Sequence, residues 1–253
     1  MNLDLPATLV LALLLTSARA AAFLVLAPPF SSRAVPGTVK ALLSVAISLP
    51  VLPTVGGAVP ALETAAVVSA VVVQVFTGAA LGFLCYLVFA AVQAAGDLID
   101  VFGGFSMAQV FDPLTTSGNA IFGRLYHWTA LTLLLASGGY TIVLQGFLRS
   151  YRAVGLDAGL DLGTLGGVVT GGLGQLMLAA LQIAAPLLAV LFLADVALGL
   201  LTRAAPALNA FALGPPFKIL LTLMTASVTF VVLPHIVDGR VERMVSTLVQ
   251  ALR

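Results

Sequence analysis

The apolar residues of the chain fall into six segments, separated by short connectors rich in glycine and proline. The apolar segments are residues 5–27, 39–52, 62–95, 121–147, 165–201 and 217–233. About 20 apolar residues suffice to cross a bilayer as a helix, so the pattern predicts membrane helices. Segment 39–52 is short for a full crossing, whereas 62–95 and 165–201 are longer than one crossing needs. We therefore expect long helices that tilt, bend or leave the bilayer.

The longest interruption of this apolar pattern is residues 93–118. Its first part keeps helical spacing, because Gln93, Asp97 and Asp100 lie at i, i+4 and i+7 and share one helix face. The two glycines at 103–104 are expected to end this helix. The sequence thus predicts a helix that carries three polar side chains on one face up to a glycine stop.

The residues after this stop combine large apolar side chains with turn residues. They include Phe105, Met107, Val110, Phe111, Asp112 and Pro113. An ordinary exposed loop has no need of two phenylalanines, a methionine and a valine. Irregular backbone at membrane depth persists only where protein or water satisfies its polar groups. We expect residues 103–118 to be buried in protein or to face a cavity.

Composition places the chain among integral membrane proteins. Sixty per cent of its residues are hydrophobic and 8% are charged, whereas about 25% are charged in soluble domains. The 253 residues suit one helical membrane domain, because the segments follow one another too closely to admit a separate soluble domain. A net charge of +1 argues against a nucleic-acid partner, which is bound through clustered Lys and Arg.

Small residues recur at spacings that favour close helix packing. Gly78 and Gly82 form a GxxxG pair, and Gly163, Gly167 and Gly171 extend the same spacing along a second segment. Such positions let another helix backbone approach closely. Chance spacing in a chain with 24 glycines is an equal alternative for the Gly78 pair.

Charged residues also lie inside apolar segments. Arg19 is within the first segment, where its cost in lipid predicts that it faces protein or water. Asp195, Gly199 and Arg203 share one face of the fifth segment. Asp195 is either a functional group or half of a structural ion pair. In the same segment Pro186 predicts a break or kink.

Motifs for catalysis are absent from the sequence. It contains no HExxH, GxSG or GxGD motif, which would mark the metal, serine and aspartyl classes of intramembrane protease. His127 and His235 have no clustered acids, and the lone Cys85 is typical of a buried apolar position. Asp97 and Asp100 have no neighbouring nucleophile, so a polar patch facing a pore or the protein is the better interpretation. We expect no enzyme activity, no cofactor and no metal site.

Three runs of the sequence are similar to the flagellar biosynthetic protein FliR family, whose injectisome counterpart is SctT. They are Arg33-Ala34-Val35-Pro36 with Lys40, AAGDLIDVFGGFSMAQVFDP at residues 94–113, and DVALGLLTRAAPALNAFALGPPFK at residues 195–218. The resemblance extends over nearly the whole chain. Gln74 and Ala207 depart from it, because the family pattern leads us to expect Glu and Gln there.

This resemblance implies an all-α membrane protein of long kinked helices and helical hairpins, with a fold like FliP joined to FliQ. It implies one domain over residues 1–253, built with FliP-like and FliQ-like partners into a helical cone in the bacterial inner membrane. The cone would lie in the flagellar basal body together with further export apparatus proteins. It would be the gated pore through which unfolded flagellar proteins are exported. The alternative is a proton-coupled secondary transporter in which Asp195 or Asp97 carries protons.

The resemblance also assigns candidate site residues. The pore plug corresponds to residues 103–118, with Gly103, Gly104, Phe105, Ser106, Met107, Phe111, Asp112 and Pro113 as its gate residues. The pore-facing or packing polar residues are Gln93, Asp97 and Asp100. The candidate subunit contacts are Gly78, Gly82, Gly167, Gly171, Asp195, Arg203 and Asn209.

Overall fold

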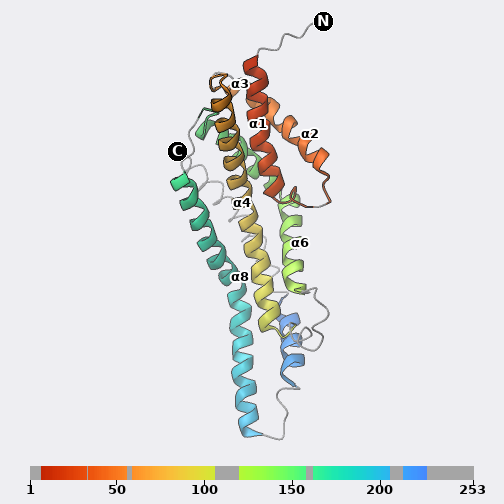
Figure 1. The fold of residues 1–253 in the computed structure, drawn as a ribbon. Helices are drawn as coiled ribbons and strands as arrows, with labels where there is room; N and C mark the ends of the chain where they lie inside the picture. The colour runs from red at the N-terminus through yellow and green to blue at the C-terminus, as the bar shows by residue number, and fades with distance from the viewer. Residues whose placement is uncertain are drawn as a thin grey trace, which may run out of the picture. The chain divides into compact units, whose positions relative to one another are not determined.

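The computed structural model describes residues 7–32, 34–55, 59–105, 120–157, 162–205 and 213–226, and all regular structure in these ranges is helical. The helices are α1 (Ala7–Leu26), α2 (Gly37–Ser48), the 3-10 helix η1 (Leu49–Val51), α3 (Leu52–Val55), α4 (Thr64–Phe102), α6 (Ile121–Ala136), α7 (Gly139–Ala153), α8 (Leu162–Ala204) and a further helix at Leu213–Ala226 (Figure 1). The predicted all-α class is confirmed.

Within the described residues, four stretches are long and apolar enough to cross a membrane: Ala7–Leu26, Gly37–Val55, Thr64–Phe102 and Gly166–Ala204. The broken pair α6 and α7 makes a fifth if it is one span. The segment predicted as 39–52 corresponds to the longer stretch Gly37–Val55, which begins two residues earlier and continues three residues further. Pro50 and Pro53 lie inside the continuing helical stretch, in η1 and α3, and early helix turns tolerate proline.

The chain divides into two compact units, each with its own buried core. The first unit holds residues 1–88, 137–173 and 240–253, and the second holds residues 89–136 and 174–239. Helices α4 and α8 contribute residues to both. The expectation of one domain over residues 1–253 stays a prediction.

In the first unit, α1 packs closely on α4 (Figure 1). A Cβ atom added to Gly82 would lie 2.7 Å from the carbonyl oxygen of Phe23, and one added to Gly78 would collide with the carbonyl of Arg19. The GxxxG pair therefore brings two helix backbones into contact, as its spacing predicts. This contact is made within the chain, so a role for the two glycines in binding another subunit stays a prediction.

The fully buried Arg19 joins three helices of the first unit. Its Nε donates to Gln74 Oε1 at 2.7 Å, and its terminal nitrogens donate to the carbonyl oxygens of Ser150 (3.1 Å) and Val154 (2.9 Å). Its guanidinium carbon lies 4.4 Å from the centre of the Tyr151 ring. Because the last carbonyls of a helix lack partners within it, Arg19 on α1 caps the end of α7. The expectation that Arg19 faces protein is confirmed.

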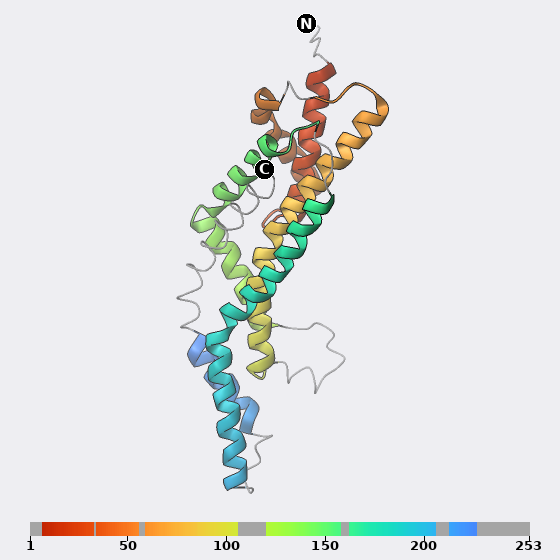
Figure 2. The same cartoon turned by 90° about the vertical axis from the view of Figure 1, so that its left-hand side faces the viewer.

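Two details of the predicted segments are wrong. Residues 121–147 were expected as one helix, but α6 ends at Ala136 and α7 begins at Gly139, with Gly138 in the left-handed region at φ 75°. Conversely, α8 does not end at Pro186 and is one continuous helix through it (Figure 2), so of the predicted break or kink the break is wrong and the kink stays a prediction. Membrane helices tolerate proline because neighbouring groups satisfy the freed carbonyl.

Candidate functional site at the end of α4

The last turns of α4 carry the three polar residues that the sequence places on one face. Asp100 is 4% exposed, and Gln93 and Asp97 are half-buried. These side chains therefore lie against protein in the second unit. Burying a carboxylate in this way is costly unless other groups hydrogen-bond to it.

Asp100 meets this need at the first turn of α6, which begins at Ile121. Its Oδ2 accepts a hydrogen bond from the backbone N–H of Gly123 at 3.1 Å, and the N–H groups of Ile121 and Phe122 also bond to this carboxyl. The first N–H groups of a helix have no partner within it, and the positive end of its dipole attracts anions. Asp100 on α4 therefore caps the N-terminus of α6.

Two glycines let α4 and α6 come close enough for this cap. A Cβ atom on Gly96 would lie 2.5 Å from the carbonyl oxygen of Phe122, and one on Gly123 would collide with Oδ1 of Asp97. We call Gly96, Asp97, Asp100, Phe122 and Gly123 the α4–α6 clamp. Sequence reasoning missed both glycines. The usable signal is their place inside helical segments, where glycine is costly and usually has a packing reason.

The candidate plug begins directly after the clamp. Helix α4 ends at Phe102, and Gly104 takes the left-handed conformation at φ 86°, as expected of a glycine that ends a helix. The Phe105 ring then contacts the Phe122 ring edge to face, with centroids 5.2 Å apart. The predicted glycine stop at residues 103–104 is confirmed, and the first apolar residue of the plug packs on the start of α6.

The rest of the plug prediction cannot be placed on this geometry. Ser106, Met107, Phe111, Asp112 and Pro113 lie outside the described residues. Their assignment as gate residues stays a prediction. The described residues show the two ends of this segment. It leaves α4 and enters α6 beside the α4–α6 clamp.

The clamp is only partly satisfied. Oδ1 of Asp97 and Oδ1 of Asp100 are buried without a hydrogen-bond partner among the described residues, as is Nδ1 of His127 further along α6. A buried unsatisfied polar atom costs about 1–3 kcal/mol. The clamp therefore retains acceptors to which further donors could bind. No three His, Cys, Asp or Glu side chains in the described ranges gather in a way that could hold a metal ion.

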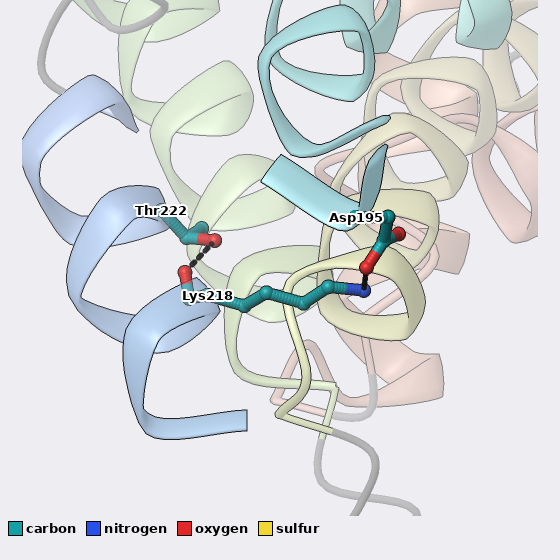
Figure 3. Close-up of polar contacts among 3 residues, drawn as sticks. All are labelled: Asp195, Lys218 and Thr222. Atoms are coloured by element: carbon teal, nitrogen blue, oxygen red, sulfur yellow. Dashed lines mark hydrogen bonds and ion pairs between the residues drawn. The ribbon is translucent and has the colours of Figure 1, made fainter. Parts of the chain in front are cut away.

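An ion pair lies beside the helix stop, in the same unit. Asp195 on α8 pairs with Lys218 on the Leu213–Ala226 helix, with Oδ1 and Nζ 2.5 Å apart (Figure 3). The Asp195 side chain is 46% exposed and that of Lys218 is 19% exposed. Of the two possibilities for Asp195, the structure shows the ion pair. Its partner was not predicted, because Lys218 lies beyond a connector and no helical spacing links it to Asp195.

The other candidate subunit contacts differ in their surroundings. Cβ atoms added to Gly167 or Gly171 on α8 would meet nothing within 4 Å. Arg203 is exposed near the end of the same helix, and Asn209 lies outside the described residues. Their assignment to a subunit interface stays a prediction.

Comparison with known proteins gives one family over nearly the whole chain. The family model described as bacterial export proteins, family 1, matches residues 10–244. The flagellar biosynthetic protein FliR of Bacillus subtilis (strain 168) is 32% identical over 178 residues, which cover 68% of this chain and 69% of that protein. FliR of Escherichia coli (strain K12) is 32% identical over 203 residues, covering 79% and 77%. The secretion system apparatus protein SsaT of Salmonella typhimurium is 30% identical over 159 residues, covering 62% and 61%.

Proposed function

The chain belongs to the FliR family of bacterial export proteins, and from this premise we propose that it is a subunit of the flagellar type III export gate. In this proposal it forms a pore with FliP-like and FliQ-like partners in the bacterial inner membrane, at the flagellar basal body. Unfolded flagellar proteins pass through the pore, and other components supply the energy. Residues 103–118 act as its plug.

The observation that supports the plug best is the α4–α6 clamp. A segment that is expected to move needs ends that do not, and here both ends of the segment meet at Asp100 and Gly123. Gly96 and Gly123 fix the two helices at backbone contact. The apolar plug side chains, beginning with Phe105, can then exchange contacts while the pore wall that carries them stays in place. Apolar constrictions of this kind close a channel by excluding water.

The outer surface of α8 supports the proposed assembly. Its exposed large apolar residues are Leu173, Met177, Leu178, Leu181, Phe192, Leu193, Val196, Leu200 and Leu201. Gly167 and Gly171 lie on the same helix with open space beside them. Exposed apolar residues suit lipid or another helix, and small residues suit close helix approach. We infer that α8 receives a helix of a partner subunit.

Co-purification with the neighbouring FliP-like and FliQ-like proteins tests the assembly. Gly167→Leu places a large side chain where the partner helix is expected, so recovery of the complex after detergent extraction should fall several-fold. Leu178→Met on the same helix conserves volume and is the matched control. Normal recovery of partners with Gly167→Leu would show that this face of α8 is not the interface.

A further inference from the structure

Every exposed side chain of α7 carries a polar group. These exposed residues are Tyr140, Thr141, Gln145, Arg149 and Arg152. The last four share one side of the helix by their i, i+4, i+8 and i+11 spacing, and we call them the polar face of α7. The opposite side of the helix is buried in the first unit. The helix thus packs on its own chain with one side and presents polar groups on the other.

Helix α2, in the same unit, has the reverse arrangement. It buries Ser44 and Ser48, and its exposed large side chains are Val39, Leu42 and Val45. Small polar residues suit contacts between membrane helices, and an apolar outer surface suits lipid, where polar groups are costly. The outer surface of α2 is therefore the one expected beside lipid, and that of α7 is not.

The contacts of α7 place its polar face level with the middle of α1. The Phe147 ring stacks on the Phe23 ring with centroids 4.5 Å apart, and the Tyr151 hydroxyl donates to the carbonyl oxygen of Thr16 at 2.7 Å. Thr16 is the tenth of the 20 residues of α1, and a helix of about this length crosses the hydrocarbon core once. The two arginines of the polar face lie on the same turns of α7 as these contacts. With α1 as a membrane span, they lie at the depth of the hydrocarbon core.

Three surroundings could receive this polar face at that depth. Lipid tails are excluded by the cost of arginine in hydrocarbon, and anionic headgroups lie at the membrane surface. A partner helix would have to supply acids, because a buried arginine is costly unless it is paired. Neither Arg149 nor Arg152 has an ion-pair partner among the described residues. Water satisfies all four side chains, and polar groups at membrane depth are tolerated where they line a water-filled cavity.

We propose that the polar face of α7 lines the water-filled path of the export pore, and that Arg149 and Arg152 contact the polypeptide in transit. This inference rests on the gate function proposed above and assigns the path to a surface of the first unit. A guanidinium group has five N–H donors, so it binds the backbone carbonyls of an extended chain. It also pairs with carboxylates, so acidic segments of the exported chain make the strongest contact.

Cysteine accessibility in the whole complex, in membrane vesicles of both orientations, tests this surface. The wild-type chain is the blank, because its one cysteine, Cys85, is buried. Gln145→Cys should react with a charged, impermeant methanethiosulfonate reagent at least about tenfold faster than Leu42→Cys, because a thiol in apolar surroundings forms little thiolate. Val143→Cys, on the buried side of α7, should react as slowly as Leu42→Cys.

Two results of this labelling would overturn the proposal. Equal rates at Gln145→Cys and Leu42→Cys would show that the two helices have the same surroundings. Labelling of Gln145→Cys in the isolated chain in detergent, but not in the complex, would show that a partner protein covers the polar face.

A jammed substrate distinguishes the pore wall from other surfaces in contact with water. The probe is a flagellar export substrate fused to a folded domain too large for the pore, so that its unfolded part stays inside the complex. It should slow the labelling of Gln145→Cys several-fold. If the jammed substrate does not co-purify with the complex, the gate function itself is wrong. If it co-purifies and the labelling rate is unchanged, only the assignment of α7 to the pore wall is wrong.

Removal of the two charges tests the contact with the exported chain. The double variant Arg149→Gln and Arg152→Gln keeps the face polar, and complex recovery should not change because both side chains are exposed. Export of a substrate with an acidic segment should slow about 2- to 5-fold relative to one with a basic segment, since fixed charges lining a narrow path attract the opposite charge. An unchanged ratio of the two export rates would show that these arginines do not contact the substrate.

Discussion

In each of the two units a buried charged side chain caps the end of another helix, and the two charges have opposite signs. In the first, a buried arginine of α1 caps the C-terminal end of α7, and in the second a buried aspartate of α4 caps the N-terminal end of α6. Each charge sits at the helix end whose dipole favours it. A single charged side chain thus ties one helix to the end of another in both units.

The caps differ in how completely their atoms are satisfied. Arg19 has protein acceptors on all three of its guanidinium nitrogens and an aromatic ring beside it. At the other cap, Asp100 and its neighbour Asp97 each keep a buried oxygen without a partner among the described residues. A fully satisfied buried polar network makes a structure rigid and specific, whereas an unpaired buried polar atom lowers its stability. The Arg19 cap is thus fully satisfied by protein, whereas the α4–α6 clamp keeps buried acceptor atoms without a partner among the described residues, beside the segment proposed as the plug.

The largest effect should come from breaking the satisfied cap. Arg19→Leu leaves Gln74 Oε1 and the carbonyls of Ser150 and Val154 buried without their donor, which costs about 3–5 kcal/mol. The complex should be recovered poorly and lose its fold at a clearly lower temperature in detergent. Arg152→Leu removes an exposed arginine from the last turn of α7 and is the matched control. Equal thermal stability of the two variants would show that the cap is dispensable.

The close backbone contact between α4 and α6 predicts the second-largest loss of stability. Gly96→Ala forces a methyl group to 2.5 Å from the carbonyl oxygen of Phe122, and overpacking of this kind costs about 1–3 kcal/mol. The same change at Gly171, where the added atom meets nothing, should leave the isolated chain as stable as before or slightly more stable, because alanine favours helix. Thermal unfolding of both variants in detergent measures the difference. Similar unfolding temperatures would contradict the close approach of α4 to α6.

Weakening the Asp100 cap of α6 should lower stability less than breaking the Arg19 cap of α7. Asp100→Asn keeps an acceptor for the Gly123 N–H but removes the charge at the positive end of α6, worth about 0.3–2 kcal/mol. Assembly should therefore survive while the clamp loosens, and hydrogen exchange at the first turn of α6 should speed up. If Asp100→Asn destabilises the complex as much as Arg19→Leu, the two caps are equivalent and the comparison fails.

The smallest stability effect is expected at the Asp195–Lys218 pair. Because Asp195 is nearly half exposed, Asp195→Asn should lower thermal stability by about 0.2–1 kcal/mol. The same variant separates the export gate from a proton-coupled transporter. Normal assembly with loss of a proton-coupled solute flux would favour the transporter.

Much of the fold could be predicted because the length of an apolar segment and the glycines that end a helix can be read from neighbouring residues in the sequence. The first segment, expected at residues 5–27, is α1, and the polar face at Asp97 and Asp100 continues a helix that stops where the glycines begin. The division between α6 and α7 was missed because a Ser-Gly pair inside an apolar run does not by itself end a helix. The break considered at Pro186 is absent because a membrane helix can continue past proline.

The site was only partly predictable, because its decisive contacts join residues far apart in sequence. The sequence identifies Asp100 as a polar residue near the end of a helix. No local pattern shows that it would lie against Gly123 on another helix. Likewise, the charge on Arg203 shares a helix face with Asp195, yet the partner is Lys218 on a later helix. Helical spacing gives the face that a residue occupies, and packing decides which helix covers that face.

Conductance of the reconstituted complex with and without residues 105–110 tests the central claim most directly. If the clamp frames a plug, removing this part of the segment should leave assembly intact and open a path for ions and small solutes, so conductance should rise at least tenfold. The same deletion in the chain expressed without its partners should give no conductance, because no pore forms. A complex that assembles normally and stays equally tight without these residues would show that the gate lies elsewhere.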